Sequence, residues 1–157
     1  MMRFFDFLFP PRVDEALLRD VSTDEFLALI APHLVPTTRP GTVALLPFGD
    51  PRIRAVLHEA KYHGSEHAFR LLALTLAEYL RDADDLPKTR FDLATRSNLV
   101  LVPVPLGKLR RKERGFNQVE EIANRAAKLL GGVSIDTGLL TRVKETPSQI
   151  SLERRKI

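Results

Sequence analysis

The stretch VLVPVPLGKLRRKERGFNQ, residues Val100–Gln118, decides how the fold is interpreted. It begins as an apolar, β-branched run that favours a strand, and the strand must stop at Pro103 and Pro105 because proline cannot donate to a neighbouring strand. A strongly basic segment follows, and Asn117 or Gln118 then caps a new helix. A buried strand that leads into a basic loop at a helix N-terminus is a geometry that binds anions, phosphates above all. The stretch therefore predicts an anion-binding loop.

Length and composition indicate one globular domain with its own core. The chain has 157 residues, of which 44% are hydrophobic and 28% charged, as in ordinary globular proteins. No run of about 18 apolar residues is present, so no membrane span is expected. The N-terminal MMRFFDFLFPP is interrupted by Asp6 and lacks a small-residue cleavage site, so it predicts a short amphipathic helix rather than a signal peptide. Without cysteine there is neither a disulfide framework nor a thiolate zinc site. We expect a cytoplasmic protein.

Positive charge is concentrated in two segments. Residues 108–114 contain five basic side chains and one acid, and residues 142–156 contain five basic side chains and two acids. The whole chain has a net charge of +4, so the remaining residues are net acidic. Clustered charge suits a small anionic ligand, whereas a broad stripe would suit duplex nucleic acid. A solvated basic loop without a ligand is the alternative interpretation.

The remaining patterns predict helices that alternate with a few short strands. Ser22 and Glu25 have the spacing of a capping box within a helical segment, and Asp50-Pro51 is a good helix start. The expected helices after the first forty residues are 51–63, 66–81 and 117–130, and the expected strands are Val43–Phe48, Leu99–Val104 and Ser134–Leu140. This order predicts an α/β domain with a mainly parallel sheet covered on both faces. We expect a helical appendage over residues 1–41 and the α/β domain over residues 42–157.

The remaining candidate residues carry weaker signals. The histidines at 33, 58, 63 and 67 have no metal-ligand spacing with carboxylates, and His63 and His67 lie on opposite sides of Gly64, so no metal site is predicted. Lys61 could reach an anion or stabilise a helix C-terminus. The segment from Arg142 to Gln149 could close over a phosphate substrate or form an unstructured tail.

Four segments, taken in order, resemble the ComF family, which comprises competence-associated relatives of type I phosphoribosyltransferases. They are Leu8-Phe9-Pro10-Pro11; Ile53-Arg54 through Lys61-Tyr62-x-Gly64; Val102-Pro103-Val104-Pro105 with Arg110 and Arg114-Gly115-Phe116-Asn117-Gln118; and Arg142 with Thr146-Pro147-x-Gln149 and Leu152. The third segment is the most specific. The resemblance covers almost the whole chain and is strongest over residues 50–152.

The resemblance implies a partial phosphoribosyltransferase-like sheet flanked by helices. It also implies that the complete protein binds phosphoribosyl pyrophosphate or a related phosphate ligand, and that Mg²⁺ neutralises part of the negative charge of the pyrophosphate. The family resemblance further implies a link to DNA uptake. The pyrophosphate would lie at the loop after Pro105, and the segment from Arg142 would be a lid. The ligand-binding residues so implied are Arg110, Arg114, Gly115, Asn117, Gln118, Arg142, Thr146 and Gln149.

Two departures from the family pattern change the expectation for this chain. Family members often begin with a four-cysteine zinc module, where this sequence has the helical segments of Val13–His33. The family's ribose-phosphate loop, with paired aspartates before Thr-Thr-Gly, should follow the lid and does not occur before Ile157. Asp84-Asp85 has no preceding strand and no following Thr-Gly. We therefore expect a C-terminally truncated family member that is inactive as a transferase in this form.

Two other functions remain open from the sequence. The same basic segments could bind single-stranded DNA in the uptake machinery, with Phe116 as the available stacking ring. The chain could also be a structural partner of competence proteins, in which case Arg110 and Arg114 could be replaced without consequence. A homo-oligomer would arise if missing strands left a sheet edge open to a second copy.

Overall fold

The computed structural model describes residues 11–35, 41–82 and 99–145. Within them the chain is a mixture of helices and two very short sheets. The helices are α2 (Val13–Arg19), α3 (Thr23–Leu27), α4 (Pro51–His58), the π-helical turn η1 (Glu59–His63), α5 (Glu66–Arg81), α6 (Lys108–Arg114) and α7 (Gln118–Leu130). The strands are β1 (His33–Leu34), β2 (Val43–Ala44), β3 (Val100–Leu101) and β4 (Ser134–Ile135).

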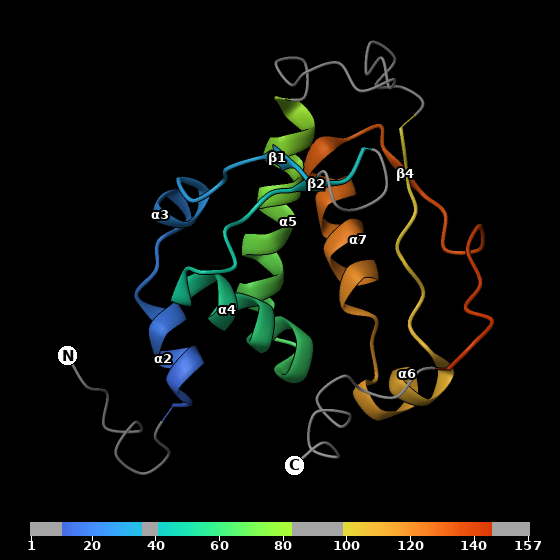
Figure 1. The fold of residues 1–157 in the computed structure, drawn as a ribbon, viewed down its shortest axis with the longest axis horizontal. Coiled ribbons are helices and arrows are strands. Elements are labelled where there is room, and N and C mark those ends of the chain that lie inside the picture. The colour runs from blue at the N-terminus through green and yellow to red at the C-terminus, as the bar shows by residue number, and fades with distance from the viewer. Residues whose placement is uncertain (1–10, 36–40, 83–98, 146–157) are drawn as a thin grey trace.

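Helices α5 and α7 run side by side through the middle of the molecule (Figure 1). Helices α2, α3 and α4 lie beyond α5, and β3 and β4 lie beyond α7. This arrangement leaves α6 and the N-terminus of α7 at one end of the molecule, near η1. Residues from the middle and from the second half of the chain therefore meet at that end.

The hydrophobic core is built mainly by the helices of the first half of the chain. Its buried members are Leu18, Phe26, Ile53, Ala55, Val56, Ala60, Ala68, Phe69, Leu71 and Leu72. Leu18 on α2 and Phe26 on α3 belong to this cluster, so the N-terminal helices share a core with α4 and α5. The predicted capping box is confirmed, since the Ser22 hydroxyl accepts from the Glu25 amide and the Glu25 carboxylate accepts from the Ser22 amide.

The main helices begin and end where the sequence predicts. The Asp50 carboxylate accepts from the Arg52 amide at the start of α4, and Pro51 occupies the first helical position. Gly64, at φ +60°, ends the turn that follows. Helix α5 spans Glu66–Arg81 as expected, and α7 runs to Leu130 with Gly131 at its C-terminus.

The predicted strands are present but shorter, and one expectation about the sheet is wrong. Only Val100–Leu101 of the expected Leu99–Val104 strand is paired, in parallel with Ser134–Ile135; Val43–Ala44 pairs antiparallel with His33–Leu34. A sheet covered on both faces was expected, yet Val100 is 46% exposed and Val104 61%. Helix α7 packs against β4, and the exposure of Val100 and Val104 shows that one face of the Leu99–Val104 segment is open to solvent.

Within the described residues, no helix combines the length and the apolar character needed to cross a bilayer.

Candidate functional site

The predicted basic loop after Pro105 is in fact a helix. Residues Lys108–Arg114 form α6, between Gly107 at its N-cap and Gly115 at its C-cap, where φ is +80°. Lysine, leucine, arginine and glutamate are all good helix formers, and basic residues in the last turn interact favourably with the helix dipole. The loop prediction is wrong because charge indicates solvent exposure and says little about backbone conformation.

Tyr62 and Arg114 connect two segments that are 52 positions apart in the sequence. The Arg114 guanidinium lies 5.4 Å from the centre of the Tyr62 ring, and the Lys61 ammonium lies 5.0 Å from the same centre. Neither cation has an ion pair with an acid among the described residues. The ring is 43% exposed. Two positive charges therefore share one accessible ring without a negative partner in this part of the chain.

Gly64 and Phe116 bring the turn that contains Tyr62 close to the segment after α6. A Cβ atom on Gly64 would lie 3.1 Å from Cε1 of Phe116, so the glycine allows the phenylalanine to approach the backbone closely. Phe116 also packs edge-on against Phe69, with ring centres 5.6 Å apart and planes at 89°. Phe116 is therefore used in packing, and the more exposed ring beside the basic residues is Tyr62.

Asn117 holds the start of α7 against the segment that leaves β3. Its side-chain oxygen accepts from the Val119 amide at 3.2 Å, which caps the helix, and its Nδ2 donates to the Val104 carbonyl at 3.1 Å. Of the two predicted capping residues, Asn117 is therefore the cap and Gln118 is the first residue of the helix. Burial of Asn117 and its two bonds show that its amide positions the backbone rather than a ligand.

The N-terminus of α7 contributes less positive potential than expected. Glu120 and Glu121 lie in its first turn, where acids interact favourably with the helix dipole. Arg111 of α6 pairs with Glu120 at 3.2 Å. Part of the charge on α6 is therefore neutralised, whereas Lys61 and Arg114 have no acidic partner among the described residues.

The remaining predicted residues lie at or near the same end. Arg110 is half-buried on α6, and Arg142 is exposed and donates from Nε to the Lys144 carbonyl at 3.1 Å. The segment after β4 returns beside the strand that leads to α6 (Figure 1), and the Glu145 carboxylate lies against Gly107. The beginning of the predicted lid thus contacts the beginning of α6. Thr146 and Gln149 lie outside the described residues.

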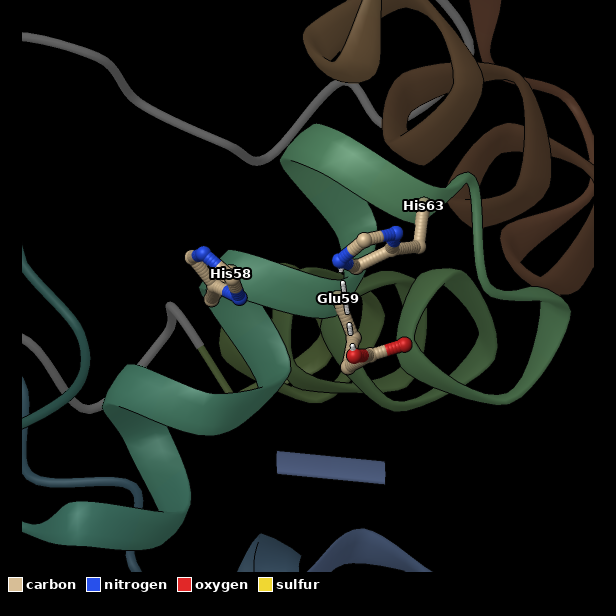
Figure 2. A group of neighbouring side chains, drawn as sticks. All are labelled: His58, Glu59 and His63. Carbon is tan, nitrogen blue, oxygen red and sulfur yellow. Dashed lines mark ion pairs between the residues drawn. The ribbon is translucent and has the colours of Figure 1, made fainter. Parts of the chain in front are cut away.

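A second group of polar side chains was not predicted from the sequence. The potential ligand atoms of His58, Glu59 and His63 lie within 4.8 Å of one another (Figure 2). His58 and His63 are five residues apart, which an α-helix would separate by about 140° around its axis. The wider π-helical turn brings them together. Glu59 and His63 have the helical spacing of four residues, but His58 joins them only through the π-helical turn, which the sequence does not reveal.

Comparison with known proteins gives no match, whether to a protein-family model, to a curated protein or to a solved structure. The function is therefore inferred from the residues of the site.

The close approach of Gly64 to Phe116 gives a testable expectation. Gly64→Ala should destabilise the chain by about 1–2 kcal/mol from the left-handed backbone conformation alone, and by more because the new methyl group contacts Phe116. Gly115→Ala is the matched control, since Gly115 has a positive φ but open space around it. Urea unfolding of both variants measures the difference. Equal destabilisation would show that the Gly64–Phe116 contact contributes nothing.

Proposed function

We propose that this chain binds a phosphorylated ligand of the phosphoribosyl pyrophosphate type at Lys61, Tyr62 and Arg114, as a ComF-like protein of the phosphoribosyltransferase type. The observation that carries this proposal is the pair of cations beside one exposed ring with no acidic partner among the described residues. The Tyr62 ring attracts both cations, and a nearby anion would relieve the repulsion between them. A phosphate group supplies that charge and accepts hydrogen bonds from both side chains.

Convergence of the segments that carry the family resemblance supports the same proposal. The Lys61–Gly64 segment contacts the Arg114–Asn117 segment through Tyr62 and Gly64. The latter segment is bonded to Val104 in the Val102–Pro105 segment. Glu145, three residues after Arg142, lies against Gly107. Segments far apart in sequence thus surround one end of the molecule, as a binding site requires.

The resemblance also implies Mg²⁺, and the side chains at this position do not hold it by themselves. Mg²⁺ prefers oxygen ligands, carboxylates above all, while Lys61 and Arg114 are cations without a carboxylate partner among the described residues. We therefore assign no magnesium ligand at the position of Lys61 and Arg114.

Calorimetric titration of the chain with phosphoribosyl pyrophosphate in magnesium buffer tests the proposal. Arg114→Ala should weaken binding by about 10- to 100-fold, because a charge-assisted hydrogen bond to phosphate contributes about 1.5–3 kcal/mol. Lys128→Ala removes one positive charge from the far end of α7 and is the matched control. It should change the affinity by less than about twofold, as expected for a screened charge roughly 15 Å away.

Failure would take either of two forms. Either the chain releases no heat on titration, or Lys128→Ala weakens binding as much as Arg114→Ala. The second result would mean that net charge rather than a site attracts the ligand.

Binding of single-stranded nucleic acid is the second candidate, and the exposure of Tyr62 beside two cations favours it. A base stacks on such a ring while the cations contact the phosphates. Titration with a short oligothymidylate at two salt concentrations separates the candidates. A steep loss of affinity with salt, together with no affinity for phosphoribosyl pyrophosphate, would favour nucleic acid.

A further inference from the structure

We propose that His58, Glu59 and His63 form a binding site for Zn²⁺ or a chemically similar divalent transition-metal ion. This inference goes beyond the proposed function and uses side chains of the same turn that do not take part in it. Two imidazoles and one carboxylate are a known ligand set for zinc, with the fourth position left for water or another ligand. The three side chains lie together on α4 and η1 (Figure 2).

The distances between the ligand atoms require only a small contraction. In a tetrahedral site with bonds of about 2.1 Å, neighbouring ligand atoms are about 3.4 Å apart. His63 Nε2 is 3.9 Å from Glu59 Oε1, and all three ligand atoms lie within 4.8 Å. Both histidines are exposed, so rotation of their side chains can close these gaps. The backbone can therefore keep its conformation when the ion binds.

A neighbouring carboxylate already orients one of the imidazoles. His58 Nδ1 lies 2.9 Å from Asp14 Oδ2 on α2. A histidine that donates from one ring nitrogen to a carboxylate presents its other nitrogen as a metal ligand, and this pairing is usual around protein-bound zinc. Because Nδ1 holds this contact, we assign Nε2 of His58 as the metal-binding atom. Asp14 is thus a positioning residue for the site.

Arg12 competes with the ion for Glu59. It donates from Nε to Oε1 at 3.0 Å and from NH2 to Oε2 at 2.8 Å. Each carboxylate oxygen has two lone pairs, so Oε1 can accept from Arg12 and still ligate an ion. The positive charge of Arg12 nevertheless opposes a second cation. Removing Arg12 should therefore strengthen metal binding.

Titration of the untagged chain with Co²⁺ and Zn²⁺ tests the site. Co²⁺ should produce visible absorption bands of a four- or five-coordinate ion at a stoichiometry of one, and Zn²⁺ should displace it. His63→Ala should weaken Zn²⁺ binding by about tenfold or more. His33→Ala removes an exposed histidine from β1 and should leave the affinity unchanged. Circular dichroism checks that both variants remain folded.

Arg12→Ala should change the affinity for Zn²⁺ in the opposite direction to His63→Ala. It should bind Zn²⁺ more tightly than the unmodified chain, and Zn²⁺ should raise its melting temperature by a larger amount. Visible Co²⁺ bands that persist in His63→Ala, or that disappear in His33→Ala, would overturn the proposal. So would the absence of any bands in the unmodified chain. These measurements contain no phosphate ligand, so they fail or succeed independently of the proposed function.

Discussion

Replacing Phe26 with alanine should lower the free energy of unfolding by about 3–5 kcal/mol. Phe26 is 0% exposed although it lies on α3, a helix of five residues. It belongs to the same buried cluster as Ile53 of α4 and Leu71 of α5. The substitution removes a large apolar side chain and leaves a cavity that the neighbours fill only in part. Because domains are stable by about 5–15 kcal/mol, a large fraction of the stability would be lost.

Urea unfolding followed by circular dichroism measures this effect, and Phe48→Ala is the matched control. The two variants lose the same atoms, but Phe48 is 67% exposed. Phe48→Ala should change the stability by less than about 0.5 kcal/mol. If the two variants were equally stable, the N-terminal helices would not belong to the main core, which would contradict the burial of Phe26.

Arg12→Ala should lower the melting temperature by on the order of 5 °C at neutral pH. Glu59 has a side chain that is 2% exposed and accepts two hydrogen bonds from Arg12. Without Arg12 the carboxylate stays buried and loses its main partner. Arg19→Ala is the control, because Arg19 pairs with Glu15 at 3.9 Å on the surface and both side chains are about 40% exposed. Exposed pairs contribute little.

The effect of Arg12→Ala should depend on pH in a defined direction. The hydrogen bond from Arg12 lowers the pKa of Glu59 below its ordinary value of 4.5. A carboxylate with a lowered pKa in the folded state stabilises the fold above the ordinary value, and this contribution is lost as the pH falls through the folded-state pKa. Arg12→Ala lacks this stabilisation at every pH, whereas the unmodified chain loses it only at low pH. The two melting temperatures should therefore approach each other below pH 4.5. A constant difference between pH 7 and pH 3 would contradict this account.

The helices could be predicted from the sequence because their signals are local. Asp50-Pro51, Gly64 and the apolar periodicity of residues 66–81 act within one or two turns, and the structure follows them. Strand lengths could not be predicted in the same way, since pairing depends on a partner elsewhere in the chain. The loop predicted for the basic residues of α6 is wrong for another reason: clustered charge indicates solvent exposure, and the same residues are good helix formers.

The candidate site could be predicted in its residues but not in its contacts. Arg114 is among the residues predicted from the sequence, but its contact with Tyr62 is not. The two residues are far apart in the sequence and meet only because η1 lies near α6. Phe116 was expected to be free for stacking and is packed on Phe69 instead. The His58–His63 pair remained hidden because the sequence gives no sign of a π-helical turn. Such turns depend on what surrounds them, and they occur frequently at functional sites.

The turn Glu59–His63 also makes this part of the chain tolerant of a change in length. A π turn contains about one more residue than an α-helical turn, so deleting one residue here would favour a continuous α-helix. The wider turn would absorb the loss, and Gly64 would keep its place beside Phe116. A deletion within the continuous helix α5 has no such turn to absorb it, so the residues that follow would rotate by about 100° and shift by about 1.5 Å. Deletion of one residue from the turn should therefore be less damaging than deletion of one residue from α5.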